Sequence, residues 1–224
     1  MLDTLPMMLG AAPFGLIFGT LAAPSGLSNG GALGMSLIVF AGSSQFIALS
    51  LLAGKASLLV IVLTTFVVNL RHALYSASLL PFVAELSQAW RALLAFWLTD
   101  ETFAVSQVRY GAADSSPNKH WFQLGSSLAM YTNWFAWTLV GVLLGRTMPQ
   151  LQHLGLEFAM AATFTGIVVP LLRSRPMVAA ALVAAGVALL CRDLPYKLGL
   201  MLAAGAGVAA GMALEGHGRR TEAP

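Results

Sequence analysis

Charged side chains are scarce in this chain of 224 residues: only 9% of the residues are Asp, Glu, Lys or Arg, and 58% are hydrophobic. Soluble domains carry roughly 25% charged residues, so too few charges are present here to cover a surface exposed to water. The deficit excludes an ordinary soluble domain. Apolar runs of about 20 residues, the length of a helix that crosses hydrocarbon about 30 Å thick, recur from end to end and predict a polytopic membrane protein.

The chain also lacks the features of several other protein classes. Its single cysteine, Cys191, excludes an internal disulfide bond. The net charge of +3 comes without the clustered basic patch that a nucleic-acid partner requires. There is no H-E-x-x-H, G-x-S-x-G or G-K-[ST] motif, and His120, His153 and His217 have no second metal ligand at a useful spacing. We therefore expect no metal, no cofactor, no nucleic-acid partner and no enzymatic activity.

Eight apolar runs predict an all-α polytopic bundle of about eight transmembrane spans. The runs cover residues 5–23, 32–53, 57–80, 92–108, 121–144, 155–172, 177–190 and 198–214. Seven spans are the alternative, because the run at 177–190 is short for a full crossing. The clearest loop, residues 109–120, separates possible halves 1–110 and 120–214 of a single transmembrane domain that covers residues 1–224.

Helix-breaking residues interrupt the first two runs. Pro13 lies inside the first run, so we expect that helix to be bent or broken. The second run contains Gly42-Ser43-Ser44-Gln45, whose polar groups either bond to neighbouring helices or belong to an unwound segment that presents them to a substrate. Glycines four residues apart predict close helix packing at three places, Gly15 with Gly19, Gly141 with Gly145, and Gly207 with Gly211.

The third and fourth runs carry ionisable residues within apolar sequence. The third places Asn69, Arg71 and His72 between hydrophobic residues, and the fourth does the same with Asp100 and Glu101. An Arg at membrane depth costs about 2.5 to 3.5 kcal/mol on insertion scales, so such groups usually have partners or a watery cavity. Adjacent helical positions point about 100° apart, so the two carboxylates cannot face the same partner. We expect one to pair with Arg71 and the other to face a cavity or a helix terminus.

Polar residues follow one side of the third run. One face holds Thr65, Asn69, His72 and Ser76, and an adjacent face holds Arg71, with Tyr75 one turn later. Three simpler interpretations stay open: Arg71 reaches the headgroups, His72 is a structural histidine, and both carboxylates are solvated at the interface. A buried carboxylate without a partner tends to take up a proton, which suits proton-coupled transport.

Basic residues predict how the eight-span arrangement is oriented. One side, which also holds both termini, collects Lys55, Arg109, Lys119, Arg173, Arg175, Arg219 and Arg220, and the other collects Arg91, Arg146, Arg192 and Lys197. The richer side is expected to be cytoplasmic, and with it both termini. We expect no cleavable signal peptide, because the residues before the first apolar run include the acidic Asp3 and contain no Lys or Arg.

Four segments in the first half of the chain match a known family in order and spacing. They are Pro13-Phe14-Gly15-Leu16-Ile17-Phe18-Gly19, Phe40-Ala41-Gly42-Ser43-Ser44-Gln45-Phe46, Asn69-Leu70-Arg71-His72-Ala73-Leu74-Tyr75-Ser76 and Leu98-Thr99-Asp100-Glu101-Thr102-Phe103. In these segments the chain resembles the AzlC/YgaZ family, the large subunits of bacterial branched-chain amino acid exporters. The second half resembles that family chiefly in hydropathy and length. The resemblance implies a multi-pass permease that exports valine, leucine, isoleucine or analogues across the inner membrane. It also implies a small hydrophobic partner subunit of the AzlD/YgaH type.

The residues of these segments suit a zwitterionic substrate with an aliphatic side chain. Arg71 or the backbone near Gly42 is a candidate to hold the carboxylate, and Asp100 or Glu101 is a candidate to hold the ammonium group. Aromatic rings are candidates to enclose the aliphatic tail. The candidate substrate-binding and transport residues are Phe14, Gly15, Gly42, Ser43, Ser44, Gln45, Phe46, Asn69, Arg71, His72, Tyr75, Asp100, Glu101 and Phe103, with Phe14, Phe46 and Phe103 as the enclosing rings.

Two other functions use the same residues. A channel for small solutes or ions would line its pore with the polar side of the third run. A membrane-embedded enzyme would use His72 with Asp100 or Glu101 as an acid–base pair, but the sequence displays no nucleophile or metal site to complete it. An exporter therefore remains the first hypothesis.

Overall fold

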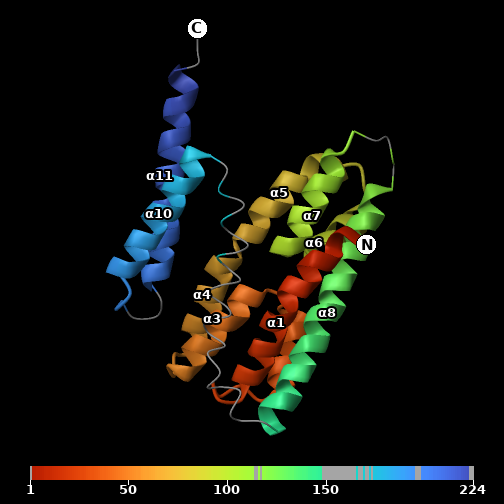
Figure 1. Cartoon of the computed structure of the whole chain (residues 1–224), viewed down its shortest axis with the longest axis vertical. Helices are drawn as coiled ribbons and strands as arrows, with labels where there is room; N and C mark the ends of the chain where they lie inside the picture. The colour runs from red at the N-terminus through yellow and green to blue at the C-terminus, as the bar shows by residue number, and fades with distance from the viewer. Residues whose placement is uncertain are drawn as a thin grey trace. The chain divides into compact units, whose positions relative to one another are not determined.

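A computed structural model describes residues 2–113, 116, 118–147, 165, 169, 172, 174–194 and 198–221. The regular structure of these residues is entirely helical, which confirms the predicted all-α class. The helices are η1 (Leu2–Thr4), α1 (Leu5–Ala22), α2 (Asn29–Ile38), α3 (Gly42–Ala53), α4 (Leu58–Asn69), α5 (Arg71–Val83), α6 (Gln88–Phe96), α7 (Asp100–Gly111), α8 (Lys119–Thr147), α10 (Arg175–Leu190) and α11 (Leu198–Thr221) (Figure 1). Apart from isolated positions, the predicted run 155–172 lies outside the described residues.

Three described helical segments are long and apolar enough to cross a membrane. They are Leu5–Ala22, Lys119–Thr147 and Leu58–Val83, the last of which comprises α4 and α5 in succession. Shorter apolar helices include Gly42–Ala53 and Arg175–Leu190. The number of crossings, eight or seven, and the two halves of one domain stay predictions. The chain folds as two compact units, residues 1–157 and 158–224.

The centre of the first unit is the parallel pair α1 and α8, which lie side by side (Figure 1). Contacts advance in the same direction along both helices, since Thr4 bonds Ser126 near one end and Thr20 bonds the Gly141 carbonyl near the other. The backbones touch where a Cβ on Gly19 would collide with the Thr138 carbonyl. Small residues permit this approach, and the predicted glycine packing is confirmed here.

The second unit contains the helical hairpin of α10 and α11, which lie side by side in Figure 1. Its helices run antiparallel, because Gly199 lies against Cys191 whereas Gly207 lies against Ala180. A Cβ on Gly211 would also contact Ala180, at 3.3 Å. The predicted close packing at these two glycines, four residues apart, is therefore confirmed as well.

Three of the predicted runs are each divided into two helices. In the run 57–80, Leu70 alone separates α4 from α5. Residues 39–41 separate α2 from α3, and Phe40 has a positive φ of 26°. The polar residues 42–45, for which the sequence left helix-to-helix bonding and an unwound segment open, are helical and begin α3. The run 92–108 is divided at residues 97–99, which the sequence analysis did not predict. Asp100 and Glu101 therefore lie in the first turn of α7 and not in the middle of one continuous span. By contrast, α1 continues through Pro13 without a break.

Capping explains why the chain breaks before Asp100. The Thr99 side chain accepts a hydrogen bond from the Thr102 backbone N–H, and the Thr102 hydroxyl accepts one from the Thr99 N–H at 2.7 Å. This reciprocal capping box satisfies amide groups that would otherwise lack partners at a helix start. The carboxylate of Asp100 in the first turn is also favoured by the positive end of the helix dipole.

Candidate functional site

An ion pair joins the first residues of α5 and α7. Arg71 Nη1 lies 2.7 Å from Asp100 Oδ2, and the two side chains are 27% and 35% exposed. The prediction that Arg71 pairs with one of the two carboxylates is confirmed, and the partner is Asp100. The other oxygen of this carboxylate, Oδ1, accepts a hydrogen bond of 2.5 Å from the Tyr75 hydroxyl. Asp100 is thus held from two positions on α5, one turn apart.

Glu101 follows Asp100 in the first turn of α7 and is partly buried. Within the described ranges it makes no ion pair, so the two neighbouring carboxylates differ in their environment. This divergence was expected from their positions about 100° apart on the helix. The same part of the chain contains no group of three or more His, Cys, Asp or Glu side chains that could hold a metal ion.

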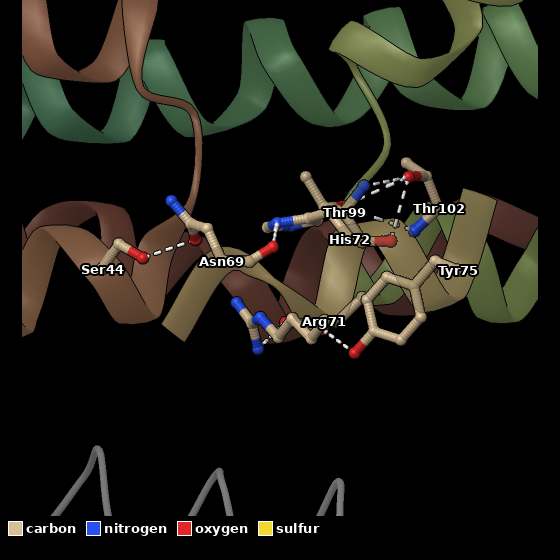
Figure 2. A network of polar contacts seen from close by, with 8 residues as sticks. Ser44, Asn69, Arg71, His72, Tyr75, Thr99 and Thr102 are labelled. Atoms are coloured by element: carbon tan, nitrogen blue, oxygen red, sulfur yellow. Dashed lines mark hydrogen bonds and ion pairs between the residues drawn. The ribbon is translucent and has the colours of Figure 1, made fainter. Parts of the chain in front are cut away.

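The junction between α4 and α5 connects the ion pair to α3. Asn69 is the last residue of α4, and its Oδ1 accepts a hydrogen bond of 2.5 Å from the Ser44 hydroxyl in the first turn of α3. The carbonyl oxygen of Asn69 lies 3.2 Å from His72 Nδ1. Figure 2 shows these residues as one network beside Arg71 and Tyr75. His72 also packs edge-on against the Tyr75 ring, with the ring centroids 5.8 Å apart.

A second polar cluster lies in the interior between α2, α3 and α8. Gln45 is fully buried there; its Nε2 donates to the Ser36 hydroxyl at 3.4 Å and its Oε1 accepts from Trp134 Nε1 at 3.0 Å. The Ser36 and Thr138 hydroxyls are 3.0 Å apart. Because both ends of the Gln45 amide have partners, this side chain bonds helices together. Ser43, its neighbour two positions earlier, is only partly buried.

The candidate aromatic residues form two separate groups of contacts. On α1 and α3, Phe14 and Phe46 meet edge-to-face with their centroids 6.4 Å apart. On α5 and α7, Phe103 stacks on Tyr75 at 4.5 Å, with the ring planes within 14° of each other. Phe103 is therefore connected to the ion pair through Tyr75, whose hydroxyl donates to Asp100. Offset stacking of this kind fixes the orientation of the Tyr75 ring.

Two candidate glycines serve the packing of α8 against the N-terminal helices. A Cβ on Gly15 would lie 3.0 Å from the Cβ of Trp137. A Cβ on Gly42 would lie 2.8 Å from the Trp134 indole. These positions need glycine because a bulky indole or its backbone occupies the space of a side chain. Trp134 was not among the predicted site residues. It lies in an aromatic-rich segment with Tyr131 and Trp137, and the sequence alone does not single it out.

Comparison with known proteins places the chain in a family. The model of the AzlC protein family matches residues 6–148. An uncharacterised membrane protein of Helicobacter pylori J99 is 36% identical over 162 residues, which cover 72% of this chain and 69% of the relative. The inner membrane protein YgaZ of Escherichia coli K12 is 31% identical over 149 residues, covering 66% of this chain and 60% of YgaZ.

A third relative carries a functional name. The branched-chain amino acid transport protein AzlC of Bacillus subtilis 168 is 27% identical over 161 residues, which cover 72% of this chain and 62% of that protein. No solved structure matches the chain. The matched residues 6–148 contain all of the candidate site, including Arg71, Tyr75 and Asp100. The chain is a membrane protein of the AzlC family.

Proposed function

We propose that this chain is the large subunit of an exporter that carries branched-chain amino acids or close analogues across the bacterial inner membrane. The observation that carries the proposal is the Arg71–Asp100 pair, a cation and an anion 2.7 Å apart between helices of a chain with few charges. A zwitterion needs one group of each sign at close range. The name of the Bacillus subtilis relative supports the choice of substrate.

Binding follows from an exchange of partners within this pair. The substrate carboxylate takes the place of Asp100 on the Arg71 guanidinium, and the substrate ammonium group takes the place of Arg71 on Asp100. Each charge of the pair keeps an opposite charge beside it, so no uncompensated charge is left at membrane depth. Arg suits the carboxylate because its planar guanidinium offers two parallel N–H donors. The Tyr75 hydroxyl holds Asp100 in place through Oδ1 during the exchange.

The apolar part of the site is formed by aromatic rings. Phe103 stacks on Tyr75, whose hydroxyl contacts Asp100, so an aliphatic side chain next to the ion pair would meet this stacked face. Phe14 and Phe46 offer a second apolar surface on α1 and α3. Discrimination between valine, leucine and isoleucine by such surfaces is modest, because one methylene is worth about 1 to 3 kcal/mol.

We assign proton coupling to Glu101. It lies next to Asp100, and within the described residues no cation forms an ion pair with it. A carboxyl group at membrane depth without such a cation takes up a proton readily. Proton entry through Glu101 would then supply the driving force for export of the neutral zwitterion.

A small hydrophobic subunit of the AzlD/YgaH type completes the transporter in this proposal. The helical segment Leu58–Val83 is apolar, largely exposed in the isolated chain, and carries the partly exposed ion pair at its middle. Lipid cannot solvate the exposed part of such a pair, whereas a partner helix with polar groups can. In this proposal both termini of the chain lie in the cytoplasm.

Transport into inside-out membrane vesicles tests the proposal. Vesicles that contain the chain with its partner subunit should accumulate radiolabelled leucine or valine when their interior is made acidic, and accumulation should fall without the gradient or without the partner. Arg71→Gln and Asp100→Asn should abolish it. Asp193→Asn is the matched control, because it makes the same change in an ion pair with side chains 75% and 89% exposed.

The same vesicles separate the rival functions. Uptake that does not saturate with substrate concentration and does not depend on the proton gradient would favour a channel. Chemically altered leucine or valine in the vesicles would favour an enzyme. Full accumulation in Arg71→Gln, Asp100→Asn and Glu101→Gln, all correctly inserted, would refute the proposed site.

A further inference from the structure

A pocket whose lining includes neither Arg71 nor Asp100 lies between α5, α6 and α8. Its volume is about 300 Å³, at the lower end of the range of small-molecule sites. Four polar side chains line it, Ser76, Gln88, Arg91 and Gln123, and leucines such as Leu79 and Leu94 line the rest. In the predicted eight-span arrangement Arg91 falls between the runs 57–80 and 92–108. In the structure it belongs to α6, whose start is capped by the Ser87 side chain.

The Arg91 pocket contains hydrogen-bond donors without acceptors. Arg91 Nε is out of contact with solvent and has no hydrogen-bond partner in the part of the chain that the structure describes. Gln123 is only 2% exposed, and its Oε1 accepts from the Tyr110 hydroxyl at 2.9 Å. The amide nitrogen of Gln123 makes no described hydrogen bond, so it is left to donate to an occupant. The Nε–H of Arg91 therefore calls for an acceptor, because unmade hydrogen bonds out of contact with water are unfavourable.

The charge of the pocket determines which occupant fits. The lining contains one cation, Arg91, and no carboxylate, so nothing there pairs with an ammonium group. Glu85, the acidic residue nearest to it in the sequence, is exposed and does not line the pocket. The Arg71–Asp100 pair, in contrast, offers both signs. An anion with an apolar body therefore suits the Arg91 pocket, and a zwitterion does not.

We propose that the Arg91 pocket binds a short aliphatic monocarboxylate. The carboxylate accepts from the Arg91 guanidinium and the Gln123 amide, since Arg recognises carboxylates through two parallel N–H groups. The aliphatic part packs on Leu79 and Leu94, which belong to the buried cluster beside the pocket. This inference goes beyond the proposed export function and does not depend on it.

A binding titration of the full chain in phosphatidylcholine nanodiscs tests the inference. Isothermal calorimetry with 3-methylbutanoate should show saturable binding, whereas 3-methylbutan-1-ol and 3-methylbutylamine, of the same shape without the negative charge, should bind at least about tenfold more weakly. Arg91→Gln should weaken 3-methylbutanoate binding by at least about tenfold, because it removes a charge-assisted pair. Arg146→Gln, the same change at an exposed position of α8, should leave binding unchanged.

The probes decide the question even if Arg91→Gln fails to fold. Equal binding of the alcohol and the carboxylate to the unaltered chain would show an apolar void only and would overturn the proposal. Unchanged affinity in folded Arg91→Gln would overturn it too. Displacement of 3-methylbutanoate by leucine would contradict the exclusion of zwitterions. Loss of binding in phosphatidylglycerol nanodiscs would assign the pocket to a lipid headgroup, whereas equal binding in both lipids supports a soluble carboxylate.

Discussion

The Arg71–Asp100 pair has a measurable signature in a double-mutant cycle. Arg71→Gln removes the positive charge, and Asp100→Asn removes the negative charge but keeps an oxygen to accept from Tyr75. Exposed ion pairs contribute about 0.2 to 1 kcal/mol, and breaking a fully buried pair costs about 3 to 5 kcal/mol. With side chains 27% and 35% exposed, this pair lies between these cases. We expect each single change to lower the free energy of unfolding by about 2 kcal/mol.

The double change should cost less than the sum of the two single changes. Once both charges are gone, neither is left at membrane depth without a partner, so we expect a coupling energy of about 1 to 2 kcal/mol. The assay is reversible unfolding of the purified chain in mixed micelles of rising dodecyl sulfate content, followed by tryptophan fluorescence. A coupling energy near zero would refute the pairing that the structure shows.

Transport by the double variant then separates a structural pair from a functional one. If the pair only stabilises the fold, the double variant accumulates leucine once it is inserted and folded. If the pair binds the zwitterion, the folded double variant still fails to accumulate leucine, because neither charged partner of the substrate is present. Wild-type accumulation in the double variant would refute the proposed binding mode while leaving the ion pair itself intact as a structural feature.

Three further changes test how the surroundings of the site are built. Gly141→Ala should lower the melting temperature, because its Cβ would collide with the α1 backbone at the Leu16 carbonyl. The control Gly125→Ala, on the same helix, meets open space and should be neutral or stabilising, so equal melting temperatures of the two variants would contradict the close packing. Ser44→Ala should cost about 1 kcal/mol of unfolding free energy by removing the hydrogen bond to the Asn69 side chain, and an unaltered value in the same micelle assay would argue against that bond. Thr99→Ala should cost about 1 kcal/mol by removing the cap of α7, with faster amide exchange in its first turn; unaltered exchange there would contradict the capping box.

The sequence allowed a break in the run 32–53 but did not predict the one before α7. Gly42 and two serines interrupt the apolar pattern of the run 32–53, which left helix-to-helix bonding and an unwound segment equally open. In the run 92–108 the break begins with Trp97 and Leu98, which continue the apolar pattern without a gap. A hydropathy pattern indicates which segments are apolar but not which hydrogen bonds they form. It therefore does not indicate a helix N-terminus that is capped by two threonine side chains. Thr99 and Thr102 carried the signal, as a capping pattern three residues apart.

The residues of the charged site were predictable from the sequence, whereas the partner of Arg71 was not. Scarcity of charge was enough to predict that Arg71 pairs with one of two neighbouring carboxylates. The choice between Asp100 and Glu101 depends on how α5 approaches α7, a tertiary contact that no periodicity within either run contains. The grouping of the rings has the same cause. Phe103 lies on Tyr75 because these two helices meet there.

The polar network lies where helices begin and end, and this placement has a mechanical consequence. Ser44 is in the first turn of α3, Asn69 ends α4, Arg71 begins α5 and Asp100 begins α7. Groups at helix ends can change partners by small rotations of a terminus, because the hydrogen bonds of the helix interior are not involved. A site that must release Arg71 from Asp100 to admit a zwitterion requires that freedom. In a continuous helix through residue 100, the same carboxylate would be held rigidly. The break at residues 97–99 therefore fits the proposed exchange of partners better than the single helix that the hydropathy pattern suggests.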